Sequence, residues 1–370
     1  SFKFVFTSQK NVLNKNNYFD FSTVAEFFII IYDITFIVYN LSLVKLKMDF
    51  LKVKTEKSFK EYSLKLFNFH YDQNKNYRKF CSSTNVNRTN IDCINKIPFI
   101  PIVFFKKNKI CIDKISHQKI FKSSGTGGAK SSHFIHSLEI YNNSIEKCFE
   151  RIYGRISNFV IIGVTPHYNS KTGSSLIYMI NELIKKSNKK ESQFLRDINE
   201  FDKLTLELEK QNRRYIIYGL SYAILDLLEE KNYNLRKSII IETGGMKGLR
   251  DEIEKEALHK IISDGFNTPN VHSEYAMTEL LSQSYSIKNQ VFSPPPWKKV
   301  LIRDFNDPFK VHRSGRGFLN IIDLANKYSC PFISTEDLGE VFENGDFKIL
   351  GRGSESDLRG CNLMLTDYTN

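Results

Sequence analysis

Short apolar runs alternate with amphipathic segments between residues 159 and 263, and this alternation limits the chain to a small set of folds. The apolar runs are typical of buried strands and cover residues 159–164, 215–220 and 238–241. The segments between and after them have helical spacing and cover residues 175–186, 221–231 and 251–263. Strands that alternate with helices favour a parallel sheet covered by helices. We therefore predict an α/β fold.

The pattern outside this region is less regular. Residues 58–80 have the spacing of one helix, and shorter strands with turns follow Gly265. In residues 251–263 the helical spacing predicts that four apolar side chains face the core: Ile253, Ala257, Leu258 and Ile261.

Charge and cysteine content exclude several classes of protein. The net charge is +12, but no block of lysine and arginine is dense enough to indicate a nucleic-acid-binding surface, so we expect no nucleic-acid partner. The six cysteines have no Cys-x-x-Cys spacing and no accompanying histidine cluster. We therefore expect neither a zinc site nor a disulfide framework. We expect the protein to be in the reducing environment of the cytoplasm.

The first 47 residues differ from the rest of the chain. Their apolar run, residues 27–44, is interrupted by Asp33 and Asn40. A spanning helix needs about 20 mostly apolar residues, and an Asp at its centre costs roughly 2.5–3.5 kcal/mol. Residues 1–47 are either a marginal membrane anchor or a non-native or upstream extension before Met48. We favour the extension, so a membrane partner is not expected.

A serine- and glycine-rich stretch, residues 123–132, has the composition of a loop whose backbone N–H groups and hydroxyls bind an anion. It is not a Walker A loop, because Ser124 and Ala129 stand where that motif has glycine. It is not a dinucleotide fingerprint starting at Gly125, because Lys130 stands at the last glycine position. A flexible linker and a triphosphate clamp remain as alternatives.

Four further motifs follow in order along the chain. They are Glu242-Thr243-Gly244-Gly245, Tyr275-Ala276-Met277-Thr278-Glu279, Ser334-Thr335-Glu336-Asp337-Leu338-Gly339 and Gly351-Arg352. Together with their surroundings, residues 238–286 and 333–364, they resemble the acyl-protein synthetases of bacterial luminescence systems. These fatty-acid–protein ligases are a branch of the adenylate-forming superfamily that includes phenylacetate–CoA ligase. The resemblance extends over residues 48–364.

The resemblance implies a fold and a division of the chain. Residues 48–350 would form the large N-terminal domain of an adenylate-forming enzyme, with mainly parallel sheets flanked by helices. Residues 351–370 would be a short remnant of the hinge and a tail, without most of the mobile C-terminal lobe.

The resemblance also implies an activity that uses ATP and Mg²⁺. The enzyme would convert a long-chain fatty acid to acyl-AMP and transfer the acyl group to a protein thiol. The final acceptor would be an acyl reductase, a carrier protein or CoA. Two alternatives remain: an acyl- or aryl-CoA ligase of the phenylacetate type, and a catalytically weakened subunit that binds nucleotide or acyl groups.

The superfamily's roles fall on residues of each motif. Thr278 would contact the α-phosphate, Glu279 would hold Mg²⁺, and Tyr275 would flank the adenine. Considered without the other motifs, Thr278 would be interpreted as a helix cap and Glu279 as a solvated carboxylate. The β- and γ-phosphates would be bound by Ser123, Ser124, Gly125, Thr126, Gly128 and Lys130. The remaining contacts would be made to the adenine by Gly244 and Gly245 and to the ribose by Asp337 and Arg352.

This chain departs from the superfamily pattern at two positions. Gly127 stands where a second Thr or Ser is usual, and Ala276 replaces a glycine. Gly127 and the expected lack of the C-terminal lobe, which carries the superfamily's catalytic lysine, keep the weakened-subunit alternative open.

Cys361 is the predicted acyl acceptor, since relatives of this kind carry the acyl group as a thioester on a cysteine near the C-terminus. Arg359 stands two residues before it, and Arg352 could add a second positive charge. A neighbouring cation lowers the pKa of a thiol and favours the nucleophilic thiolate. The alternative is a small buried apolar cysteine.

Overall fold

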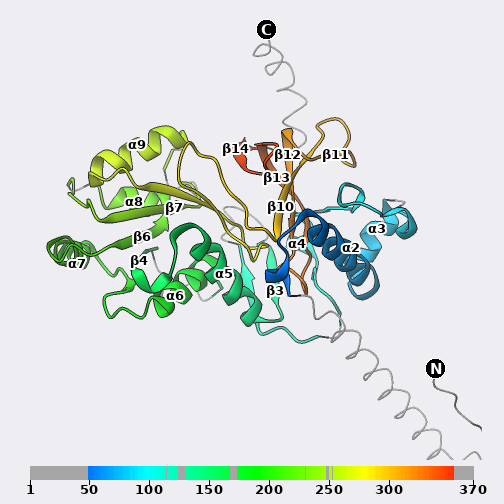
Figure 1. The fold of residues 1–370 in the computed structure, drawn as a ribbon, viewed down its shortest axis with the longest axis horizontal. Helices are drawn as coiled ribbons and strands as arrows, with labels where there is room; N and C mark the ends of the chain where they lie inside the picture. Colours follow the sequence, from blue (N-terminus) through cyan, green and yellow to red (C-terminus); the bar gives the residue numbers. More distant parts are fainter. Residues whose placement is uncertain are drawn as a thin grey trace, which may run out of the picture. The chain divides into compact units, whose positions relative to one another are not determined.

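The computed structural model describes residues 49–84, 86–113, 115–123, 130–166, 173–229, 231–246, 250–251 and 253–353. By its internal contacts the chain divides into Ser1–Asp49 and Phe50–Asn370, and the second unit contains all of the elements named below (Figure 1). The predictions for residues 1–47, for Ser124, Gly125, Thr126 and Gly128, and for Cys361 lie outside the described residues.

A six-stranded sheet, the parallel sheet, forms one part of this unit. Its strand order is β5-β4-β6-β7-β8-β9, and every neighbouring pair is parallel except β8 and β9. The strands are β4 (Val160–Val164), β5 (Gln193–Phe194), β6 (Tyr215–Leu220), β7 (Ser238–Thr243), β8 (Val271–Tyr275) and β9 (Ser284–Ser286). Every residue of β4 and β6 is buried, as expected for strands with both faces covered.

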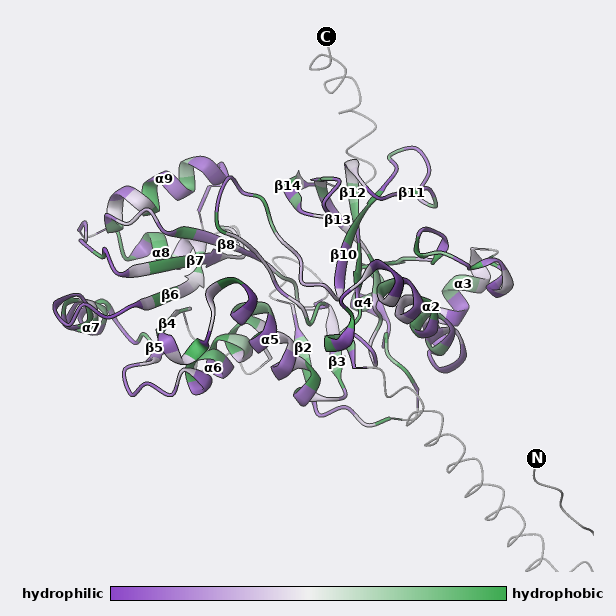
Figure 2. Cartoon of the chain, in the orientation of Figure 1, coloured by the Kyte–Doolittle hydropathy of each residue, from purple (hydrophilic) through white to green (hydrophobic). Residues whose placement is uncertain are grey.

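Helices pack on both faces of the parallel sheet. They are α5 (Leu138–Tyr153), α6 (Ser175–Ser187), α7 (Ile198–Lys210), α8 (Ser221–Asp226) and α9 (Lys255–Phe266). Helices α7, α8 and α9 share one apolar cluster with the strands, which includes Ile162 of β4. The next residue, Gly163, points to the opposite face, because a Cβ built there would meet Ile180 of α6. The helices carry both hydrophobic and hydrophilic residues, as amphipathic covering helices do (Figure 2).

Polar side chains fix where these helices begin. Ser137, Ser174 and Asp197 each accept a hydrogen bond from the main-chain N–H three residues further on, at the starts of α5, α6 and α7. At the other end, Asn188 and Asn267 adopt the left-handed conformation that often terminates a helix.

A second sheet, the antiparallel sheet, consists of strands that follow the parallel sheet in the sequence, together with β1, which precedes it. Its order is β1-β13-β12-β10-β11, with β14 also paired to β13, and only β1 and β13 run parallel. The strands are β1 (Ile100–Pro101), β10 (Lys298–Arg303), β11 (Val311–His312), β12 (Gly315–Asp323), β13 (Phe332–Val341) and β14 (Phe347–Arg352). A separate hairpin consists of β2 (Lys119–Lys122) and β3 (Ser132–Ile135).

Three helices precede or interrupt this part of the chain: α2 (Glu56–Gln73), α3 (Lys75–Ser83) and α4 (Phe104–Lys107). Near the junction of α2 and α3, the His70 ring hydrogen-bonds to the main-chain oxygen of Lys327, and Asn74 donates to that of Ser329. None of the helices in the described ranges combines the length and apolar character that crossing a lipid bilayer requires.

The predicted α/β class is confirmed, and β6 has the predicted bounds. The single helix expected at 58–80 is instead two helices, because the Asn74 side chain accepts a hydrogen bond from Tyr77 N–H and starts a new one. The prediction for the helix at 251–263 is partly wrong. Leu258 is buried, but Ala257 and Ile261 are exposed, and Ile262 packs in the core instead.

Candidate active site

Tyr275 and Asp337 join the two sheets. Tyr275 is the last residue of β8, and Asp337 lies within β13. The Tyr275 hydroxyl donates a hydrogen bond of 2.7 Å to Oδ2 of Asp337. The rings of Phe292 and Phe347 contact the Tyr275 ring at centroid distances of 5.9 and 5.2 Å. The carboxyl end of β8 therefore meets the antiparallel sheet at this point.

Gly244 and Gly245 follow the neighbouring strand β7. Their φ angles are +77° and +62°, a backbone conformation that glycine adopts without strain. They lie at the same edge of the parallel sheet as Tyr275, because β7 and β8 are parallel neighbours. Ligands of α/β proteins commonly bind outside the carboxyl ends of parallel strands.

Arg352 lies opposite Asp337 in the pairing of β13 with β14. The Arg352 guanidinium is largely exposed and makes an ion pair of 3.1 Å with Glu336. Burial raises the pKa of Asp337, while the hydrogen bond from Tyr275 and the charge of Arg352 act in the opposite direction. The two residues predicted to bind a ribose are thus brought side by side.

Glu279 lies on the turn that follows β8 and is only 4% exposed. Burial raises its pKa, and the Ser131 side chain, Arg352 and Lys106 lower it in part. Ser131 is also buried, and its hydroxyl makes no hydrogen bond at normal distance within the described residues. A carboxylate beside a hydroxyl without a hydrogen-bond partner supplies oxygen ligands, which Mg²⁺ prefers.

The described residues contain no group of three or more His, Cys, Asp or Glu side chains arranged to hold a metal ion. This is compatible with Mg²⁺, which commonly binds through one or two carboxylates together with substrate phosphates. The Glu279 environment therefore fits a magnesium ion that arrives with a nucleotide.

The predicted phosphate loop is closed at its base. Ser123 N–H donates to the Ser131 carbonyl at 3.1 Å, and Ser131 N–H donates to the Ser123 hydroxyl at 3.0 Å. The Ser123 side chain thus helps to close the loop, and Lys130 is exposed. Thr278 contacts β3, the strand that follows this loop, because its carbonyl oxygen lies 2.7 Å from Nδ1 of His133.

A buried ionic network around Glu242 was not predicted. Glu242, in β7, is fully buried, and Lys255 of α9 donates to both carboxylate oxygens at 2.8 Å. Ser221 and Ser273 each donate to the same carboxylate at 2.5 Å. Burial alone would raise the pKa of Glu242, but His259, Lys255 and Ser221 together lower it to about 2. The network ties the strands around Gly244 together.

Tyr275, Thr278, Glu279, Asp337 and Arg352 are therefore brought together, with Gly244 and Gly245 at the end of the adjacent strand. Ser131 and His133 were missed because nothing in a serine-rich run distinguishes one serine, and because the contact of His133 with Thr278 spans 145 residues. Glu242 carried a signal, since a carboxylate at the end of an apolar strand needs a partner when it is buried.

Known proteins resemble this chain in sequence and in fold. A family model described as "Acyl-protein synthetase, LuxE" matches residues 38–369. A long-chain-fatty-acid–luciferin-component ligase of Aliivibrio fischeri is 22% identical over 303 residues, covering 75% of this chain and 77% of the relative.

Among solved structures, an open conformation of 2-hydroxyisobutyryl-CoA ligase, in complex with 2-HIB-AMP and CoA, superposes with a TM-score of 0.58. It is 10% identical, and the match covers 80% of this chain and 74% of that one. An ATP-bound RpMatB-BxBclM chimera gives a TM-score of 0.50 at 16% identity, over 65% of this chain. The match covers only half of the chimera. These likenesses show the fold.

Proposed function

Because the chain belongs to the acyl-protein synthetase family, we propose that it is a ligase that activates a long-chain fatty acid with ATP and passes the acyl group to a thiol. The relative from Aliivibrio fischeri carries a name that specifies a long-chain fatty acid as substrate. The α/β fold is that of adenylate-forming ligases.

The observation that carries the proposal is the meeting of Tyr275, Asp337 and Arg352 beside the Glu279 turn. In the proposed complex Tyr275 flanks the adenine, which approaches the backbone of Gly244 and Gly245. Asp337 and Arg352 bind the ribose. Thr278 binds the α-phosphate.

The other phosphates are bound by the loop at the β2–β3 hairpin. Ser123, Ser124, Gly125, Thr126, Gly128 and Lys130 surround the β- and γ-phosphates in this proposal. Glu279, with Ser131 beside it, holds Mg²⁺. The ion would neutralise charge on the phosphate oxygens.

The reaction proceeds in two steps. A carboxylate oxygen of the fatty acid attacks the α-phosphorus, and the bond to pyrophosphate breaks to leave acyl-AMP. A thiolate then attacks the acyl carbon, and AMP leaves with the bonding electron pair. Donors that are already oriented before the charge develops supply most of the acceleration in such a transfer.

Cys361 is the proposed first acceptor, and an acyl reductase or a carrier protein is the proposed second. The proposed location is the cytoplasm. All five cysteines in the described part of the chain carry free thiols, which suits a reducing compartment.

Acid-dependent exchange of pyrophosphate into ATP tests the proposal. A panel of fatty and aryl carboxylic acids is assayed without CoA, and CoA is then offered as acceptor. We expect exchange with long-chain fatty acids and acylation of the protein itself. Acyl-CoA as the sole product would establish the CoA-ligase alternative, and absence of exchange with every acid would establish the weakened-subunit alternative.

A further inference from the structure

His133 links the strand that leaves the phosphate loop to the turn that carries Thr278. It lies in β3 and is fully buried. Its Nδ1 is 2.7 Å from the carbonyl oxygen of Thr278. Because a carbonyl oxygen only accepts, Nδ1 carries the proton and donates it to this bond.

Ser131 makes a second link between the same two segments. Along this stretch Ser131 and His133 are buried, whereas Ser132 and Phe134 are partly exposed. Alternate residues of an extended strand share a face. Ser131 therefore approaches Glu279 on the face from which His133 reaches Thr278.

Other buried side chains also hold the backbone of the turn and of the residues that follow it. Asn326 donates to the carbonyl oxygen of Glu279 at 2.8 Å. Oδ2 of Asp323 accepts hydrogen bonds of 2.9 Å from the N–H groups of Leu281 and Ser282. In addition to these bonds, the His133 side chain connects the turn, through Thr278, to the strand that leaves the phosphate loop.

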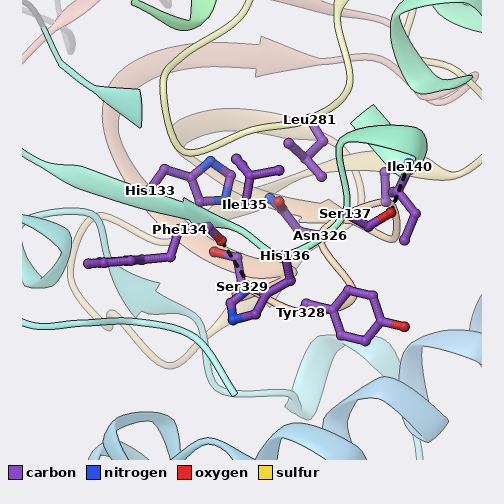
Figure 3. Close-up of a pocket in the computed structure, with 11 residues that line it drawn as sticks. His133, Phe134, Ile135, His136, Ser137, Ile140, Leu281, Asn326, Tyr328 and Ser329 are labelled. Atoms are coloured by element: carbon purple, nitrogen blue, oxygen red, sulfur yellow. Dashed lines mark hydrogen bonds between the residues drawn. The ribbon is translucent and has the colours of Figure 1, made fainter. Parts of the chain in front are cut away.

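The environment of the second ring nitrogen of His133, Nε2, is consistent with the tautomer that carries its proton on Nδ1. Burial lowers the pKa of His133 to about 4, so the ring is neutral and Nε2 is an acceptor. Nε2 and Oδ1 of Asn326 make no hydrogen bond within the described residues. Both residues line a cavity of about 10 Å³ (Figure 3).

We propose that His133 is a positioning residue for adenylation, which fixes Thr278 relative to the phosphate loop so that the α-phosphate and the β- and γ-phosphates of one nucleotide are bound together. The inference rests on the proposed function and adds a residue to it. Its energetic basis is that small displacements of a group that orients a reacting phosphate can reduce the rate by about 100-fold.

Three substitutions of His133 separate the donor from the bulk of the ring. His133→Asn keeps an N–H donor near the Nδ1 position, His133→Gln moves the donor to the Nε2 position, and His133→Leu removes it. Two quantities are measured for each: the shift in melting temperature caused by ATP and Mg²⁺, and kcat and KM for acid-dependent pyrophosphate exchange.

We expect His133→Leu and His133→Gln to lower kcat about tenfold or more and to reduce the ATP-induced shift, whereas His133→Asn remains close to the wild type in both. His136→Asn is the matched control and should change neither quantity, because the hydrogen bond of the His136 ring at 3.2 Å goes to the Phe134 carbonyl, two residues away, and not to the turn that carries Thr278.

Equal behaviour of the Asn and Gln variants, or an unimpaired Leu variant, would overturn the inference. Should His133→Leu fail to fold, the Asn and Gln pair decides, since both are polar amides that differ in where the donor lies. Absence of exchange in the wild type would refute the proposed function instead, and the ATP-induced shift would still report on His133.

Discussion

The Tyr275 hydroxyl donates a 2.7 Å hydrogen bond to Asp337 and so connects the end of a parallel strand to the interior of an antiparallel one. The two residues are 62 positions apart in the sequence. The bond sets the aromatic ring proposed for the base and the carboxylate proposed for the sugar at a fixed separation before any nucleotide binds.

Removal of this bond should destabilise the protein without removing the ring. We expect Tyr275→Phe to lower the free energy of unfolding by about 1–3 kcal/mol, because the half-buried acceptor Asp337 loses its partner. Urea denaturation measures the change, and Tyr71→Phe in α2 serves as control. An unchanged unfolding midpoint would show that the Tyr275–Asp337 bond contributes nothing to stability.

Glu279→Gln should separate activity from stability. The variant keeps the shape of the side chain but loses the charge proposed to hold Mg²⁺, so we expect pyrophosphate exchange to fall by about 100-fold or more. The apo protein should be no less stable, since burial disfavours the charged carboxylate. Exchange rates across a Mg²⁺ titration, beside thermal unfolding without nucleotide, provide the measurement.

The matched control for Glu279 is Glu340→Gln, which removes a carboxylate paired with Arg316 at the surface. It should leave both quantities unchanged. Wild-type exchange in Glu279→Gln would remove that residue from the proposed site.

The Glu242 network should stabilise the protein in a defined pH range. The pKa of Glu242 is lowered from 4.5 to about 2, so the folded state holds the carboxylate ionised where the unfolded state takes up a proton. The stabilisation is complete above pH 4.5 and disappears as the pH falls through 2. At about 1.4 kcal/mol per pKa unit, Glu242→Gln should cost about 3 kcal/mol at pH 7.

Urea denaturation of Glu242→Gln and wild type at pH 7 and near pH 3 tests this expectation. The difference in unfolding free energy should be smaller at the lower pH. A difference that stays constant with pH would mean that packing, rather than the charge of Glu242, is responsible for it.

Glu274 should destabilise the folded protein as the pH rises, in contrast to Glu242. It is buried in β8, its two carboxylate oxygens make no hydrogen bond within the described residues, and burial raises its pKa from 4.5 to about 7. The folded state therefore binds the proton more tightly than the unfolded state, and stability falls as the pH rises from 4.5 to 7. Glu274→Gln should gain up to about 3 kcal/mol over wild type at pH 8.

Thermal unfolding of Glu274→Gln at pH 8 and at pH 4.5 provides the comparison. The advantage of the variant should vanish at the lower pH, where both side chains are neutral. A variant less stable than wild type at pH 8 would contradict the assignment of an unpaired buried carboxyl.

Cys361→Ser should separate the two proposed chemical steps. Acid-dependent pyrophosphate exchange should continue at the wild-type rate, because it requires only acyl-AMP formation. Acylation of the protein, detected as a label released by hydroxylamine, should be lost. Cys148→Ser is a control, as burial raises the pKa of that thiol to about 12 and keeps it unreactive. Undiminished labelling of Cys361→Ser would exclude Cys361 as the acceptor.

Local patterns were sufficient to predict much of the fold. The apolar run at 215–220 became β6 without a change of bounds, and the helix expected at 175–186 is α6, Ser175–Ser187, with Ser174 as its cap. Helix α7 was not predicted, although Phe201, Leu204 and Leu208 have helical spacing. Ile261 of α9 was assigned to the wrong face because the helix begins only at Lys255 and its apolar stripe runs through Leu258 and Ile262.

The site was predicted as a series of motifs but not as a set of contacts. The order of Gly244, Tyr275, Glu279 and Asp337 indicated a nucleotide site, and the structure brings Tyr275 to Asp337. The partner of Thr278 could not be predicted, because hydrogen bonds between distant segments leave no periodic trace in a single sequence.

Asp323 ends β12 of the antiparallel sheet, yet its carboxylate is fully buried and bonded to main-chain amides that lie between β8 and β9 of the parallel sheet. A fragment that ended before β10 would leave those amides without this acceptor, and a fragment that began there would leave Asp323 with the Ala325 N–H but without the donors from Leu281 and Ser282. Each sheet therefore supplies hydrogen-bond partners that the other needs when buried, and we expect either half expressed alone to be less stable than the intact unit.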